Sequence, residues 1–99
     1  MKYILIQRPG FKERYINEVN KVNKLTSEQL IQLYNSNVKT GIVGVYAQAI
    51  MLVALRHVIK SRFGVSPIKI EDNIILSLTD SVIISDDKLF YEGTNLPVN

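Results

Sequence analysis

Cysteine and tryptophan are absent from this chain of 99 residues, and histidine occurs once. Without cysteine the chain can form no disulfide, no thiolate nucleophile and no cysteine-based zinc site. The lack of cysteine fits a reducing compartment. The N-terminus has only four apolar residues in a row, whereas a secretory signal needs about 7–15. We therefore expect a cytoplasmic protein.

The motifs of several enzyme classes are also missing. Gly41 and Gly44 are too closely spaced for a glycine-rich phosphate loop, and no nucleophile-elbow motif occurs. His57 has no acidic neighbour on its predicted helix, since the nearest acid, Glu71, lies fourteen residues further on. We therefore expect no cofactor and no metal site, and we favour a non-catalytic protein. The C-terminal acids lack the spacing of a calcium loop and are typical of turns: Glu71, Asp72, Asp80, Asp86 and Asp87.

The apolar content is sufficient for a folded core. Hydrophobic residues make up 46% of the chain and charged residues 21%, which are ordinary values for a globular protein. The length allows one domain, so we predict a single α+β domain over residues 1–99. Residues 93–99 contain Pro97 and are expected to form a loose tail.

The N-terminal half predicts one strand and two helices. Tyr3–Ile6 is a continuous apolar run, which is typical of a strand covered on both faces. Apolar residues recur at helical spacing from Phe11 to Val22. Thr26 and Gln29 have the spacing of a capping box. We therefore expect a second helix to begin at Thr26 and to end at residues 35–37.

The segment Gly41–Phe63 predicts the longest helix, with Gly64 as its left-handed cap. Its uncharged part, Thr40–Leu55, has 16 residues, fewer than the ~20 that span a bilayer, so we expect no membrane span. The apolar side chains fall into two stripes, which predicts burial on more than one side. The stripe expected to face the sheet consists of Met51, Leu52, Leu55, Val58, Ile59 and Phe63.

After Gly64 the pattern changes to short β-rich runs separated by turn residues. These runs predict a C-terminal antiparallel meander of three to four strands, which the N-terminal strand joins. The predicted fold class is therefore α+β, with one short strand, three helices of which the third is long and largely buried, and then the meander. The runs are residues 67–71, 74–78, 82–84 and 89–91.

The second stripe of the long helix is formed by Tyr46, Ile50 and Val53 and continues to His57. Its spacing of four, three and four is that of a heptad-like seam. Two arrangements would bury it: the two N-terminal helices of the same chain, or a second copy of the protein. The pattern leaves both open. In the second arrangement these four residues are the interface candidates of a homodimer.

Charge is distributed unevenly along the chain. The net charge of +3 divides into +7 for residues 1–64 and −4 for residues 65–99. The basic half can face nucleic acid or acidic lipid, or the acidic half can neutralise it. We favour neutralisation, because no run of adjacent basic residues occurs. For nucleic acid the candidates are Arg56, Lys60 and Arg62, although no aromatic residues interleave with them.

Three functions are compatible with these patterns. The first is a small interaction module that self-associates through the long helix or a sheet edge, or that binds another protein. The second is a nucleic-acid-associated protein. The third is a small ligand-binding domain or enzyme with a pocket between helices and sheet, to which Tyr34, Tyr46 and His57 would supply polar groups. We favour the first, because the long helix has two apolar stripes and no catalytic set is present.

Overall fold

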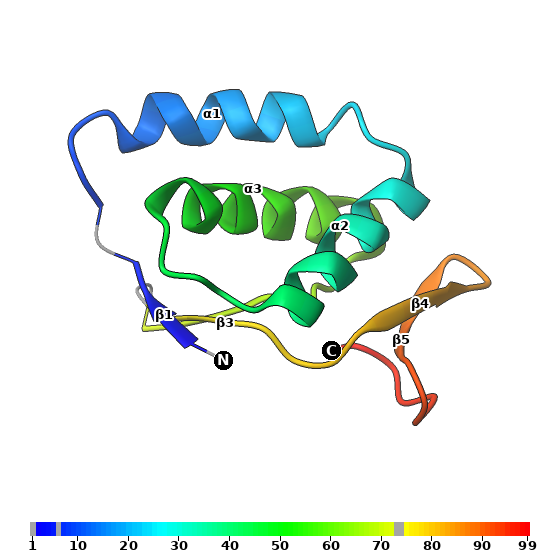
Figure 1. The fold of residues 1–99 in the computed structure, drawn as a ribbon. Coiled ribbons are helices and arrows are strands. Elements are labelled where there is room, and N and C mark those ends of the chain that lie inside the picture. The colour runs from blue at the N-terminus through cyan, green and yellow to red at the C-terminus, as the bar shows by residue number, and fades with distance from the viewer. Residues whose placement is uncertain (1, 6, 73–74) are drawn as a thin grey trace.

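The computed structural model describes residues 2–5, 7–72 and 75–99 and confirms the α+β class. One strand precedes three helices, and four strands follow them (Figure 1). Ile6, Asn73 and Ile74, which belong to predicted strands and a predicted turn, lie outside the described residues. The elements are β1 (Lys2–Ile4), α1 (Phe11–Val22), α2 (Ser27–Thr40), α3 (Tyr46–Phe63), β2 (Lys69–Glu71), β3 (Ile75–Ser77), β4 (Val82–Ser85) and β5 (Lys88–Tyr91).

The strands form two separate antiparallel sheets rather than one meander. β3 lies between β1 and β2, so the N-terminal strand does join the C-terminal strands. β4 and β5 form a hairpin of their own, because α2 binds the backbone at the start of β4. The Tyr34 hydroxyl donates to the carbonyl of Asp80 at 3.0 Å, and the Asn35 amide bonds to both the N–H and the carbonyl of Val82 at 2.9 Å. A helix thus satisfies polar groups that a continuous sheet would have paired.

α2 begins where the sequence predicts. The N–H of Gln29 donates to the Thr26 hydroxyl at 3.1 Å, and the Gln29 side-chain oxygen accepts from the N–H of Thr26 at 2.9 Å. This reciprocal pair is the predicted capping box. The predicted cap at the end of α3 is also confirmed, since Gly64 has a φ of 78° and this left-handed conformation favours glycine.

The end of α2 lies further along the chain than predicted. The helix continues through residues 35–37 to Thr40. The Asn35 side chain bonds to β4, and the Asn37 side-chain oxygen accepts from the Gln48 amide of α3 at 2.9 Å. Asparagine favours helix ends because its side chain competes for the local backbone; Asn37 does bond to the carbonyl of Leu33 at 2.8 Å, but both asparagines also have tertiary partners that hold this part of the helix.

The predicted start of α3 at Gly41 is wrong. The helix begins at Tyr46, because Gly41 and Gly44 have φ angles of 85° and 81°, which a right-handed helix does not permit. The Gln48 side chain holds the intervening connection in place. It accepts from the N–H of Val43 at 3.0 Å and donates to the carbonyl of Gly41 at 3.1 Å. Within the described ranges, no helix combines the length and the hydropathy that crossing a bilayer requires.

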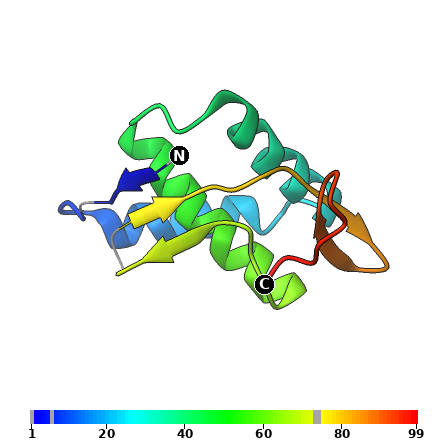
Figure 2. The same ribbon diagram turned by 90° about the horizontal axis from the view of Figure 1, so that it is seen from below.

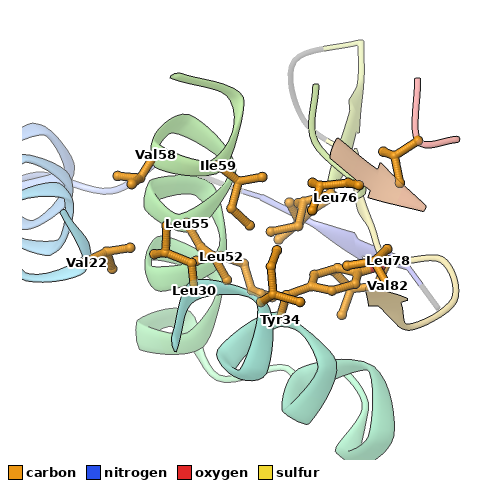
Figure 3. Packing of buried hydrophobic residues seen from close by; sticks show 14 of the residues in the cluster. Val22, Leu30, Tyr34, Leu52, Leu55, Val58, Ile59, Leu76, Leu78 and Val82 are labelled. Atoms are coloured by element: carbon orange, nitrogen blue, oxygen red, sulfur yellow. The ribbon is translucent and has the colours of Figure 1, made fainter. Parts of the chain in front are cut away.

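α3 is the centre of the fold and is buried on two sides, as predicted. α1 packs against one side of it, and the β1–β3–β2 sheet lies on the other (Figure 1). Seen from below, the three strands of that sheet lie across α3, and the hairpin projects to one side (Figure 2). In Figure 3, α3 contributes Leu52, Leu55, Val58 and Ile59 to the core, which also contains Val22, Leu30, Tyr34, Leu76, Leu78 and Val82.

β1 is not covered on both faces, which corrects the expectation for residues 3–6. Tyr3 is partly buried opposite Leu76, whereas Ile4 is 63% exposed. The helices cover only one face of the three-stranded sheet (Figure 1), so alternate residues of its edge strand face solvent.

The C-terminal segment lies against β5, although the sequence suggested a loose tail. The N–H of Val98 donates to the carbonyl of Leu89 at 3.0 Å, and Pro97 forms a β-bridge with Phe90. Val98 is buried in the core. The segment therefore occupies the outer edge of the hairpin and leaves few of its polar groups for another strand.

Candidate functional site

The second stripe of α3 is closed at Ile50 by α1. Ile50 is 1% exposed within this single chain. It borders a hollow of about 250 Å³ that is lined on the α1 side by Arg14, Asn17 and Lys21 together with Glu18. Of the two arrangements that would bury this stripe, the chain therefore has the internal one, and no second copy is needed to cover Ile50.

Tyr46, at the start of the same stripe, is also covered from within the chain. The guanidinium carbons of Arg8 and Arg14 lie 4.4 Å and 5.2 Å from the centre of its ring, within the range of cation–π attraction. The Tyr46 hydroxyl accepts a hydrogen bond from the N–H of Arg8 at 3.1 Å. Tyr46 thus anchors the N-terminal segment, while Val53 is partly buried against the core.

The stripe opens at His57, where an aromatic row begins. His57 is exposed, and its ring meets the edge of Tyr15 with the ring centres 6.4 Å apart. Tyr15 in turn stacks on Phe11 at 6.0 Å with the rings 3° from parallel. We call these three residues the aromatic row. The sequence places no aromatic residue between the basic residues at the end of α3, and Phe11 and Tyr15 come from another helix.

Three basic side chains from α3 and β2 line one cavity and form what we call the cationic cluster. Arg56 and Lys60 lie one turn apart on α3, and Lys69 begins β2. All three line a cavity of about 210 Å³, together with Ser66. Arg56 and Lys60 also line a second hollow of about 320 Å³, which includes His57. These two side chains therefore link the cavity to the end of the aromatic row.

No acidic side chain in the described part of the chain forms an ion pair with the cationic cluster. Among the described residues the ion pairs are Lys2–Glu71 at 3.9 Å and Lys21–Glu18 at 3.4 Å, and neither includes a member of the cluster. Burial lowers the pKa of Lys69, and the charges of Arg56 and Lys60 lower it further. The neutralisation of the basic half that we favoured from the sequence is thus limited to one ion pair between the two halves of the described chain.

Two residues named from the sequence lie outside this site. Arg62 points to the other side of the helix end, where its guanidinium donates to the carbonyl of Asn23 at 2.8 Å. Tyr34 is fully buried. Its hydroxyl bonds to Thr79 and Asp80, and burial raises its pKa above 10.0. Tyr34, Tyr46 and His57 therefore have separate partners and do not form one shared polar site.

Lys69 and Ser66 were missed by the sequence analysis. Lys69 follows Lys60 by nine residues and belongs to another element, so helical periodicity could not associate the two. The only signal was the short connection after Gly64, which returns the chain beside the last turns of α3.

Comparisons with known proteins add no assignment to this geometry. No protein-family model, no curated protein and no solved structure gives a significant match to the chain.

Proposed function

We propose that the chain is a non-catalytic binding module for single-stranded nucleic acid. The observation that carries the proposal is the cationic cluster, which has no acidic ion-pair partner among the described residues and two of whose members share a hollow with His57, the end of the aromatic row. Cations attract phosphates along a strand, and aromatic faces stack with bases of any sequence. This second hypothesis from the sequence now has the aromatic component that it lacked.

Self-association through the long helix has less support than nucleic-acid binding. That hypothesis required the stripe around Ile50 to be open, and Ile50 is buried against α1. At the β4–β5 hairpin, self-association through a strand edge is disfavoured too, because Asn35 bonds to the edge of β4 at Val82 and the C-terminal segment occupies the edge of β5.

The test is the affinity for a fluorescent single-stranded oligonucleotide, measured by anisotropy at two salt concentrations. Three phosphate contacts on a single strand give a slope of about −2 in log K against log salt, so affinity should fall about 20-fold between 50 and 200 mM. The double variant Arg56→Glu and Lys60→Glu should abolish binding. Wild-type protein that does not bind at 50 mM salt would contradict the proposal.

A matched control separates local contacts from overall charge. Lys39 and Lys88 are exposed and lie on α2 and β5, outside the cluster. Lys39→Glu with Lys88→Glu changes the net charge by the same amount. We expect this control to retain most of the wild-type affinity, and an equal loss in both double variants would mean that only the net charge matters.

The aromatic row is tested by two substitutions at Tyr15. Tyr15→Leu removes the ring and should weaken binding by about 1–3 kcal/mol if one base stacks there. Tyr15→Phe keeps the ring and should bind as the wild type does. If both variants bind equally well, the aromatic row has no part in the interaction.

Self-association remains a second candidate on the outer face of the hairpin. Ile83 is 40% exposed and pairs with Phe90, which forms a bridge with Pro97. Residues directly opposite in neighbouring strands share one face, so these three side chains form an apolar row that a second copy could cover. Light scattering should then give a dimer, and Ile83→Lys should give a folded monomer. Ile4→Lys, at another exposed apolar residue, is the control. A monomeric wild type at high concentration would end this candidate.

A further inference from the structure

We infer that the cavity between the end of α3 and the start of β2 binds one phosphate group. The cavity has a volume of about 210 Å³ and is lined by the three members of the cationic cluster and by Ser66. A cavity of about 150 Å³ can enclose a benzene molecule, and a phosphate is smaller than that. The inference rests on the same cations as the proposed function, but it assigns them a single anion instead of a strand.

The charges in this cavity favour an anionic occupant. Arg56, Lys60 and Lys69 come from two elements and repel one another; burial lowers the pKa of Lys69, and the charges of the other two lower it further. A bound dianion would replace this repulsion with attraction. The Lys69 ammonium donates one hydrogen bond to the main-chain oxygen of Asn99, which leaves two of its three N–H donors for a ligand.

Ser66 adds a buried hydroxyl group to the lining of the cavity. It is 4% exposed, and its hydroxyl oxygen accepts a hydrogen bond from the N–H of Ile68 at 3.1 Å. A serine hydroxyl that accepts one hydrogen bond can also donate its proton, so Ser66 can donate to a phosphate oxygen in the cavity.

The phosphate can come from two sources with the same chemistry. One is the terminal phosphate of a nucleic-acid strand, which would place the strand end in the cavity and its bases toward the aromatic row. The other is a small phosphorylated metabolite, for which the aromatic row is not needed. The experiment therefore has one arm for the phosphate alone and one arm for each form of strand end.

In the first arm, the amide spectrum of ¹⁵N-labelled protein is recorded during titration with inorganic phosphate and, at the same ionic strength, with chloride. We expect saturable shifts for residues 64–69 with phosphate and none with chloride. Lys69→Met and Lys60→Gln should each weaken binding at least tenfold, whereas Ser66→Ala should weaken it less and Lys39→Met should not change it. Shifts that do not saturate, or that persist unchanged in folded Lys60→Gln, would overturn the inference.

In the second arm, the same oligonucleotide is compared with and without a 5′-phosphate. Tighter binding of the phosphorylated strand supports the inference and identifies the strand end as the source. Equal binding, combined with saturable binding of inorganic phosphate, supports a metabolite as the source. Binding of inorganic phosphate without binding of the strand supports the cavity assignment and contradicts the proposed function. Binding of the strand without binding of phosphate supports the proposed function and contradicts the cavity assignment.

Discussion

The second stripe of α3, which runs from Tyr46 to His57, is buried at one position and open to solvent at another. Ile50 and His57 occupy equivalent positions on this stripe, two turns apart on the same helix. Ile50 is 1% exposed under α1, whereas His57 is exposed and its ring meets the edge of Tyr15 of α1. The apolar pattern predicts that a stripe is buried, but it does not predict which element covers it or where the cover ends.

The difference separates the two hypotheses that the sequence left open. A stripe that is open along its whole length would need a second copy of the chain. A stripe that is closed at Ile50 and open at His57 instead leaves a small polar surface, bordered by cations and aromatic rings. Such a surface suits a charged ligand better than a helix–helix interface.

The largest expected effect is at the closed end of the stripe. Ile50→Asp would replace a buried apolar side chain with a charge between α1 and α3, which Arg14 and Lys21 at the neighbouring hollow offset only in part, at a cost of about 3 kcal/mol or more. We expect the variant to be largely unfolded by circular dichroism. Val43→Asp, at a residue that is 67% exposed, should remain folded. A folded Ile50→Asp protein would mean that α1 does not cover the stripe in solution.

A smaller effect is expected where α2 holds the segment before the hairpin. Tyr34→Phe removes the hydroxyl that donates to the carbonyl of Asp80 and accepts from the N–H of Thr79. Leaving such groups unpaired should cost about 1–3 kcal/mol, measured as the free energy of unfolding in urea. A variant as stable as the wild type would show that water replaces the Tyr34 hydroxyl with no loss of free energy of unfolding. The backbone groups of Thr79 and Asp80 would then be as accessible to water as His57 is.

The same variant gives a pH test. Burial raises the pKa of Tyr34 in the folded state above 10.0, so the unfolded chain ionises first as the pH rises. Stability from the neutral hydroxyl is therefore complete below about pH 10 and declines above it. The stability difference between wild type and Tyr34→Phe should shrink as the pH rises from 9 to 11, and a constant difference would contradict the raised pKa.

A somewhat smaller loss of stability is expected from the capping box of α2, which lies away from both Ile50 and His57. Thr26→Ala removes the acceptor for the N–H of Gln29 and should cost about 0.5–2 kcal/mol. Thr26→Ser keeps an acceptor and serves as the control. An unchanged denaturation midpoint in Thr26→Ala would mean that the cap contributes nothing in solution.

The smallest effect on stability is expected at the open end. Arg56→Ala with Lys60→Ala removes partly or fully exposed cations that have no ion-pair partner among the described residues. The free energy of unfolding should change by no more than about 0.5 kcal/mol per substitution, while affinity for the oligonucleotide should fall. A large loss of stability instead would show that these side chains serve the fold rather than a ligand.

The local chemistry of the sequence was sufficient to predict much of the fold. Thr26 and Gln29 started α2, and Gly64 ended α3, because each depends on residues a few positions away. Asn35 and Asn37 misled the prediction, because each side chain also bonds to a distant residue, Val82 and Gln48 respectively, that no local pattern reveals. The candidate site was predicted only in part: Arg56, Lys60 and His57 were named, but the rings of Tyr15 and Phe11, the cavity and Lys69 were not.

The sequence by itself determined the α+β class, the start of α2, the end of α3 and the burial of α3 on two sides, because periodicity and capping act over a few residues. Only the tertiary structure decided that α1 covers Ile50, that the strands divide into two sheets, and that Lys69 joins Arg56 and Lys60. These outcomes depend on contacts between distant residues, such as the bond of Asn35 to Val82 across 47 positions. Such contacts form only after the helices and strands have packed against one another, and no short stretch of sequence contains both partners.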